Sequence, residues 1–242
     1  MHRTKPTGLT FSEFSFFDKK NLERYEAYSA KNPDMAADEV VWRVNNHLDK
    51  EKYAYDVLIE DCDSLYVIVN KYFKLPEGFC PKNLVEADGI LMRSDTALAY
   101  TQMRGAAKAE GYSISVVNAY RSVELQKKLY DRHLLTETVA VADESCARPG
   151  YSEHHTGLAI DIEGSIPGAR KIHQTPEAAW VKENCYKYGF IVRYLPETVE
   201  ITGYMSEPWH LRYVGTEVSN GMRERNINTL EEYAERFLKS YR

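Results

Sequence analysis

The sequence predicts an α+β fold in which helices flank a small, mostly antiparallel sheet, with a helical appendage at the N-terminal end. Two observations lead to this prediction. Segments with helical and with strand-like spacing follow one another without the regular strand–helix–strand repeat of a doubly wound parallel sheet. The chain also has 242 residues, of which 43% are hydrophobic, and this is enough for one substantial core with a small appendage.

Residues 1–50 form the predicted appendage. Helical spacing extends over residues 21–28 and 38–48, and the Asn-Pro-Asp sequence at 32–34 separates the two segments. The apolar side chains of the second segment fall on one helical face, formed by Val40, Val41, Val44 and Leu48. We therefore expect two short helices that share a small core.

The rest of the chain is expected to divide into a connector and one main domain. Residues 51–64 are acidic and polar, which is typical of a connector, and residues 65–242 form the domain. The apolar, β-branched run at 65–69 predicts a short strand. A helix is expected over residues 94–110, where the hydroxyl of Ser94 can cap the first turn.

Local signals place the remaining elements of the domain. Ser122 can cap a helix, Pro176 occupies the first position of another, and Thr229 with Glu232 forms a capping box for the last. Apolar alternation and β-branched runs predict four strands, at residues 113–117, 157–162, 190–194 and 209–214.

Composition excludes some classes of function. The net charge of −5 provides no basic surface for nucleic acid. No stretch approaches the roughly 20 apolar residues of a membrane span, and no apolar run follows the first residues as in a signal peptide. A cytoplasmic protein fits this pattern, and so does an exported protein without its leader. The sequence does not indicate an oligomeric state.

The four cysteines are scattered and form no Cys-x-x-Cys pair, which argues against zinc-finger and thioredoxin-like sites. We expect four free thiols, although one or two disulfides stay open. These cysteines are Cys62, Cys80, Cys146 and Cys185.

Two motifs together predict a catalytic metal site. The first is Ser-Glu-His-His-Thr-Gly-Leu-Ala-Ile-Asp at residues 152–161, and the second is Glu-Pro-Trp-His at 207–210. His154, Asp161 and His210 provide three ligands of the kind that zinc takes in catalytic sites, where a fourth position is left for water. The same ligand set could also hold other divalent metals.

The spacing of these residues suits convergence on one ion. Asp161 lies inside a predicted strand and His154 in the loop that leads into it. His155 is a rival ligand, but adjacent residues in an extended segment point in opposite directions, so only one of the two histidines should face the metal. Glu207 is expected to reach the site from a loop, next to the water rather than the metal, as a general base must.

The segment Ala-Tyr-Arg-Ser at 119–122 joins a predicted strand to a predicted helix, a position where active-site residues often gather. Arg121 could bind a carboxylate with two parallel hydrogen bonds or stabilise a developing oxyanion. Gln126, one turn into the helix, could add a donor. A surface ion pair is the alternative role for Arg121.

Five motifs follow one another along residues 119–210. They are Ala119-Tyr120-Arg121-Ser122, Ala147-Arg148-Pro149-Gly150, the run from Ser152 to Asp161, Tyr188-Gly189-Phe190-Ile191 and Glu207-Pro208-Trp209-His210. In this order they resemble the motifs of the VanY-type D-alanyl-D-alanine carboxypeptidases, and the LD-carboxypeptidases of the same superfamily are similar. The resemblance covers roughly residues 65–215.

The resemblance implies a small α+β zinc peptidase that acts on bacterial cell-wall stem peptides. It implies that Glu207 is the general base, and that Arg121 and Ser152 bind the terminal carboxylate and neighbouring backbone, with Gln126 beside them. By the same motif positions the zinc ligands are His154, Asp161 and His210. The sequence departs from the family at His155, where relatives often carry Gln, and at Asn118, where a small residue is commoner.

The predicted reaction is removal of the C-terminal D-alanine from peptidoglycan stem peptides by a Zn²⁺-dependent DD-carboxypeptidase. Three alternatives stay open: an LD-carboxypeptidase that trims tetrapeptide to tripeptide, a D-Ala-D-Ala dipeptidase, and a binding module with a non-catalytic zinc. The resemblance favours a location in the cell envelope, outside the cytoplasm, over a cytoplasmic one.

Overall fold

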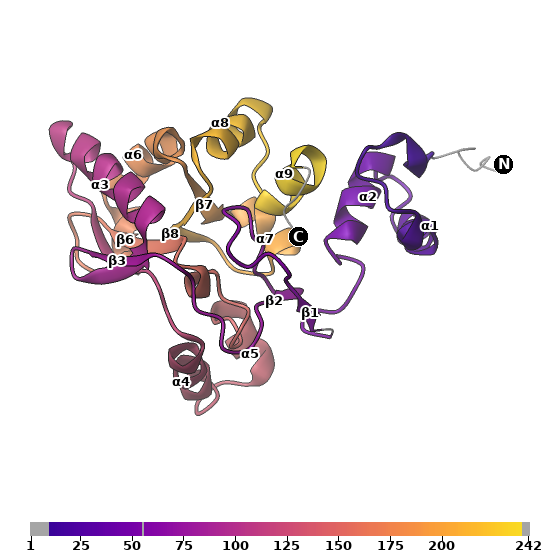
Figure 1. The fold of residues 1–242 in the computed structure, drawn as a ribbon, viewed down its shortest axis with the longest axis horizontal. Coiled ribbons are helices and arrows are strands. Elements are labelled where there is room, and N and C mark those ends of the chain that lie inside the picture. The colour runs from indigo at the N-terminus through magenta and orange to yellow at the C-terminus, as the bar shows by residue number, and fades with distance from the viewer. Residues whose placement is uncertain (1–9, 55, 239–242) are drawn as a thin grey trace.

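A four-stranded antiparallel sheet lies at the centre of the main domain. The computed structural model describes residues 10–54 and 56–238. The strands are ordered β5-β6-β8-β7, and every neighbouring pair is antiparallel, which confirms the predicted α+β class (Figure 1). Their bounds are Ser115–Asn118 for β5, Ala159–Glu163 for β6, Glu207–Tyr213 for β8 and Phe190–Tyr194 for β7.

One face of this sheet is buried against two helices, α3 (Ser94–Ala109) and α6 (Pro176–Asn184). Ile160 and Ile162 of β6 and Leu211 of β8 belong to that core. Successive side chains of a strand point to opposite faces, so Asp161 and the residues on either side of Leu211 point the other way. The core thus directs the motif residues of β6 and β8 to the far face of the sheet.

A second core lies over the end of β7. Helices α8 (Thr216–Arg225) and α9 (Leu230–Phe237) contribute half of its buried residues, and Ile191 and the segment at residues 68–73 contribute most of the others. The hydroxyl of Thr229 accepts a hydrogen bond from the backbone N–H of Glu232 at 3.4 Å, which confirms Thr229 as the cap. The Glu232 side chain, the second half of the predicted capping box, forms an ion pair with Arg236 at 2.9 Å.

Two short helices project beside the sheet, α4 (Val123–His133) and α5 (Val139–Ser145) (Figure 1). The Ser122 hydroxyl caps α4, as predicted, by accepting from the N–H of Leu125 at 3.2 Å. Neither α5, α8 nor the single-turn helix α7 (Val199–Thr202) was predicted from the sequence.

A β-hairpin that the sequence analysis did not predict precedes α3. Its strands are β3 (Leu84–Ala87) and β4 (Ile90–Arg93). The turn is formed by Asp88 and Gly89, which both have positive φ, at 50° and 79°. An Asp-Gly pair between two short strands is a strong hairpin signal.

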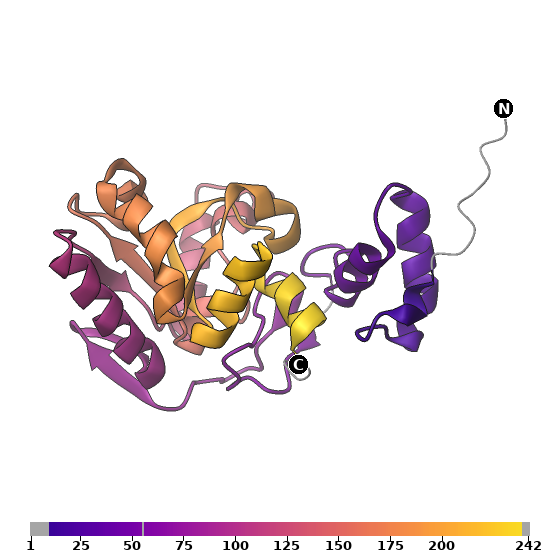
Figure 2. The same cartoon turned by 90° about the horizontal axis from the view of Figure 1, so that it is seen from above.

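The N-terminal helices α1 (Leu22–Lys31) and α2 (Ala37–Asn45) confirm the two helices expected there. They lie at one end of the molecule, and α9 lies between α2 and the sheet (Figures 1 and 2). Asp38 of α2 pairs with Arg236 of α9 at 2.8 Å. The expected connector contains a short strand, β1 (Val57–Leu58), which pairs in parallel with β2 (Phe73–Lys74) of the main domain. The division at residues 50 and 64 stays a prediction.

The strand predicted at residues 65–69 is wrong. Val67 and Val69 are fully buried, but the segment has no strand pairing. The carbonyls of Leu65 and Val67 instead accept hydrogen bonds from Nη2 of Arg212, at 3.0 and 2.8 Å. An arginine side chain thus satisfies the backbone groups that a neighbouring strand would otherwise satisfy.

All four cysteines are free thiols, as expected. Among the described residues, no helix is long and apolar enough to cross a membrane.

Candidate active site

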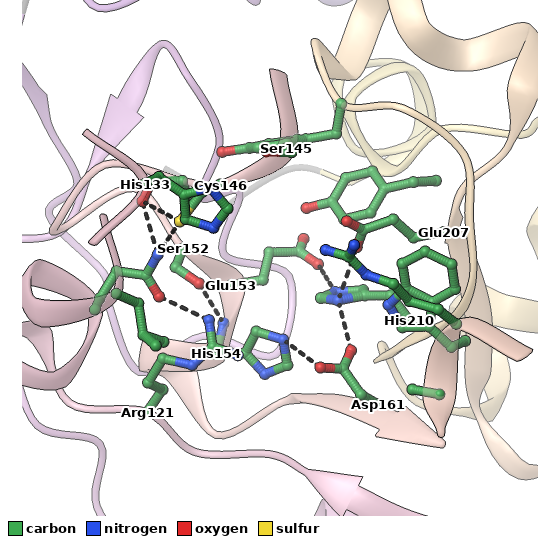
Figure 3. A pocket seen from close by; sticks show the side chains of 18 residues that line it. Arg121, His133, Ser145, Cys146, Ser152, Glu153, His154, Asp161, Glu207 and His210 are labelled. Atoms are coloured by element: carbon green, nitrogen blue, oxygen red, sulfur yellow. Dashed lines mark hydrogen bonds and ion pairs between the residues drawn. The ribbon is translucent and has the colours of Figure 1, made fainter. Parts of the chain in front are cut away.

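The two sequence motifs meet on the far face of the sheet. Asp161 of β6 is paired in register with His210 of β8, and His154 comes from a single 3-10 turn, η3 (Glu153–Thr156), just before β6. One ligand atom from each of these three residues lies within 4.8 Å of the other two (Figure 3). The three predicted ligands are therefore brought together.

In each of the two histidines, one ring nitrogen has an outer hydrogen-bond partner and the other faces Asp161. Nδ1 of His154 faces the carbonyl of Ala119 at 2.7 Å, which leaves Nε2 facing Asp161 Oδ2 at 3.3 Å. His210 is turned the other way, with Nε2 3.2 Å from Oε2 of Glu153 and Nδ1 3.3 Å from Oδ1 of Asp161. Such outer partners fix the tautomer that ligates a metal.

The Asp161 carboxylate is also fixed, and its surroundings suit a bound cation. Oδ2 accepts a hydrogen bond from Nδ2 of Asn118 at 2.7 Å, so this departure from the family pattern orients a predicted ligand. Oδ1 is buried and lies 3.3 Å from Nδ1 of His210, but among the described residues it accepts no well-formed hydrogen bond. A buried carboxylate oxygen without a donor suits a metal ion.

The charges of the site also suit a metal. Burial would raise the pKa of Asp161, but the imidazoles of His154 and His210 hold it well below its usual range. Burial lowers the pKa of His154, which favours the neutral form that ligates metals. Burial would lower the pKa of His210 too, but the neighbouring carboxylates of Asp161 and Glu153 raise it to about 9. A metal ion must therefore displace a proton from His210.

Glu207 lies beside the ligand cluster without joining it. Its Oε2 is 3.7 Å from Nδ1 of His210, and its side chain keeps 23% of its surface exposed. Burial raises its pKa to about 7, although nearby cationic groups, including Arg170 and Arg121, act against this. The expected loop position is wrong, since Glu207 is the first residue of β8. The register shift between β7 and β8 next to Glu207 turns its side chain toward the site.

Arg121 and Gln126 form a unit at the other side of the pocket. Nη1 of Arg121 donates to Oε1 of Gln126 at 2.7 Å, and Nε2 of Gln126 donates to the carbonyl of Ala147 at 2.7 Å. The remaining N–H groups of this guanidinium have no acceptor among the described residues. Arg121 therefore lines the pocket rather than forming the surface ion pair that was the alternative.

Ser152 and His155 form hydrogen bonds to backbone groups. The Ser152 hydroxyl caps η3 by accepting from the N–H of His154 at 3.3 Å, and it lines the pocket as well. His155 points away from the metal, with Nδ1 at 2.6 Å from the carbonyl of Arg121 and Nε2 accepting from the N–H of Gly150 at 3.2 Å. Both of its nitrogens are in use, so His155 is not a rival ligand.

The pocket has a volume of about 290 Å³ and includes residues that the sequence analysis did not select (Figure 3). Trp209 lies within the Glu-Pro-Trp-His motif and Tyr194 ends a predicted strand, so both had a local signal. Ala147 begins the Ala-Arg-Pro-Gly motif and Glu153 lies within the run from Ser152 to Asp161, so these two also had a local signal. No signal pointed to the remaining lining residues, which are Leu129, His133, Ser145, Cys146, Ala169, Arg170 and Tyr204.

Comparison with known proteins agrees with this geometry. The family model of VanY, D-alanyl-D-alanine carboxypeptidase, matches residues 89–216. The chain belongs to the VanY family. It is 33% identical to a D-alanyl-D-alanine carboxypeptidase of Enterococcus faecium over 225 residues, which cover 91% of this chain and 68% of the relative. It is 38% identical to the putative carboxypeptidase YodJ of Bacillus subtilis over 194 residues, 75% of this chain and 71% of that protein.

Solved structures of the family share the fold. The LdcB LD-carboxypeptidase has a TM-score of 0.70 and 36% identity, over 77% of this chain and 92% of its own. A variant of the vancomycin-resistance D,D-pentapeptidase VanY in complex with Zn(II) has a TM-score of 0.60 and 33% identity, over 69% and 97%. The expected enzyme class and cofactor are confirmed: this VanY-family chain is a metallocarboxypeptidase, and its metal is zinc.

Proposed function

We propose that this enzyme removes the C-terminal D-alanine from peptidoglycan stem peptides as a DD-carboxypeptidase. The observation that carries the proposal is a single pocket with a three-ligand metal centre, a carboxylate beside it and an arginine with free donors across from it. Two curated relatives are D-alanyl-D-alanine carboxypeptidases, and the related VanYB structure contains D-alanine-D-alanine.

His154 Nε2, Asp161 and His210 Nδ1 would hold the zinc ion. When bound, zinc supplies a Lewis acid that polarises the scissile carbonyl and makes water more acidic. Asn118, Ala119 and Glu153 keep these three ligands in the orientation that binding requires.

Glu207 would act as the general base and then as the acid. Its carboxylate would accept a proton from the attacking water and deliver it to the nitrogen of the leaving D-alanine. A base with a pKa near neutrality is suited to both transfers, because it accepts and releases a proton with little cost. The partial burial that raises the pKa of Glu207 provides this property.

Arg121 would bind the terminal carboxylate of the substrate through the N–H groups that the protein leaves unused. Gln126 would hold the guanidinium in place, and Ser152 would contact the same end of the peptide from the pocket wall. A fixed cation in the same pocket as the metal centre limits the enzyme to the last peptide bond of a chain, because an internal bond presents no free carboxylate.

The LD-carboxypeptidase alternative has support from LdcB and from the pneumococcal L,D-carboxypeptidase DacB, which has a TM-score of 0.56. The zinc chemistry is shared, so only the pocket wall that meets the residue before the cut distinguishes the two activities. A non-catalytic zinc module is disfavoured, because Glu207 lies next to the cluster and no fourth protein ligand closes it in the described chain.

The decisive experiment uses two synthetic stem peptides, one ending in L-Lys-D-Ala-D-Ala and one in L-Lys-D-Ala. The zinc-loaded enzyme is incubated with each, with an EDTA-treated control, and products are identified by mass spectrometry. We expect loss of one alanine from the first peptide only. Loss from the second would establish the LD activity, and cleavage of neither by zinc-loaded protein would contradict both. Peptidoglycan stem peptides as substrates would favour a location in the cell envelope over a cytoplasmic one.

A further inference from the structure

Behind the pocket, one carboxylate determines how a proposed metal ligand is oriented. Oε2 of Glu153 lies 3.2 Å from Nε2 of His210, on the side of the ring opposite Asp161 (Figure 3). If this nitrogen carries the hydrogen, the lone pair is on Nδ1, the atom 3.3 Å from Asp161. Glu153 thus selects the tautomer of His210 that can bind zinc.

Glu153 is held in turn by two arginines. Its Oε1 accepts from Nε of Arg193 at 2.7 Å and from Nη1 of Arg212 at 2.9 Å. The side chains of all three residues are 0% exposed. Two donors therefore fix one oxygen of the carboxylate, and this leaves the other oxygen for the histidine.

Arg193 connects this arrangement to the C-terminal helix. Its Nη1 and Nη2 donate to the two carboxylate oxygens of Glu231, at 2.9 and 2.8 Å. Glu231 belongs to α9 and is fully buried, and it also accepts from Nδ2 of Asn70 at 2.9 Å. Because the Arg193 guanidinium contacts one glutamate along each edge, it cannot turn without breaking one of these contacts.

We infer that Glu153 and, through Arg193, Glu231 are positioning residues for the zinc ligand His210, so that helix α9 is part of the metal centre. The inference rests on the proposed metal site but not on the peptide that is cut. Two arginines against two glutamates balance in formal charge, so each buried charge has a partner, and removal of one partner would leave a buried charge unpaired. Its function would be to hold one imidazole in one tautomer.

Glu153→Gln tests this inference sharply. Glutamine has only one acceptor oxygen, and Arg193 and Arg212 both require an acceptor at the Oε1 position. The NH₂ group must then face Nε2 of His210, which becomes an acceptor, and the ring hydrogen moves to Nδ1. The variant therefore keeps the shape of the side chain and blocks the ligating nitrogen.

The measurement is zinc affinity, by competition with a chromophoric chelator, together with the visible absorption spectrum of the cobalt-substituted protein. We expect Glu153→Gln to weaken zinc binding by about 10–100-fold, as is typical of lost outer partners, and to alter the cobalt spectrum. Glu231→Gln should weaken zinc binding by less, because it acts through Arg193. Asp38→Asn is the control. It removes the ion pair between Asp38 of α2 and Arg236 of α9, which does not contact Glu153, and should leave zinc affinity unchanged.

Zinc affinity equal to that of the wild type in Glu153→Gln would overturn the inference and leave the network a purely structural one. An effect of Glu153→Gln without any effect of Glu231→Gln would overturn the role of α9. If Glu153→Gln fails to fold, Glu231→Gln and its control decide alone. Neither zinc affinity nor the cobalt spectrum depends on the peptide substrate, so an error in the proposed reaction would not alter the result.

Discussion

Asp161 and His210 lie directly opposite each other on neighbouring strands, and Oδ1 of the first is 3.3 Å from Nδ1 of the second. The register of β6 and β8 therefore places two of the three proposed ligands side by side, and η3 adds His154 from the chain just before β6. Two rigid strands give such a site a precision that loops do not provide.

Loss of the Asp161 carboxylate should cost more zinc affinity than loss of its outer partner. We expect Asn118→Ala to weaken zinc binding by about 10–100-fold, and Asp161→Asn to weaken it further, because the second change removes a ligand atom. Isothermal titration with zinc compares the two variants. Equal affinities for Asp161→Asn and the wild type would rule Asp161 out as a ligand.

Replacement of Glu207 should separate catalysis from metal binding. Glu207→Gln is expected to lower kcat by about 10²–10⁴-fold, the usual contribution of a general base, and to leave one zinc ion bound per chain. Peptide turnover is measured together with metal content. Normal turnover in this variant would show that another group takes the proton.

Arg121 should control the requirement for a free carboxylate. The loss of charge-assisted hydrogen bonds in Arg121→Ala is expected to lower kcat/KM for free-acid peptides by about 10–100-fold, equivalent to roughly 1.5–3 kcal/mol. Peptides with an amidated C-terminus should be affected little. The comparison is made on matched free-acid and amidated peptides, and an unchanged ratio between them would exclude Arg121 as the carboxylate-binding group.

Glu177 should make stability depend on acid pH. Burial would raise the pKa of this carboxylate, but hydrogen bonds from the backbone N–H of Ser113 and from other donors lower it to about 2. Its contribution is therefore complete above about pH 5, since the unfolded-state pKa is roughly 4.3, and is lost as the pH falls toward 2.

We expect Glu177→Gln to lower the free energy of unfolding by about 1.5–3 kcal/mol at pH 7. The difference from the wild type should shrink as the pH falls from 5 toward 2. Urea unfolding at several pH values measures this difference. A constant difference across that range would show that the carboxylate charge does not contribute.

The motif chemistry could be predicted from the sequence because its geometry is local. His154 lies in a single turn and Asp161 in the strand that follows it, and the alternation of side chains along β6 determines which way Asp161 points. The position of Glu207 could not be predicted in the same way. Strand alternation alone does not place residues 207 and 210 on one face, and only the irregular register with β7 brings them together.

The network behind the site was beyond prediction for a different reason. No neighbour of Glu153 in the sequence indicates its ion pairs, because its partners Arg193 and Arg212 are 40 and 59 residues away. The same long-range contacts of Arg212 explain the wrong strand at 65–69, since β-propensity says nothing of an arginine that replaces a neighbouring strand. By contrast, the Asp88–Gly89 hairpin had a local signal that the sequence analysis overlooked.

The link from His210 to α9 has a consequence for the order of events during synthesis. A nascent chain that has been translated through His210 contains every proposed metal ligand but not yet Glu231. The zinc centre would then have all three proposed ligands but would still lack Glu231, which holds Arg193. Full zinc affinity would then be reached only after α9 has been translated. An enzyme truncated before that helix would keep both metal-binding motifs, but the ring of His210 would be less firmly oriented.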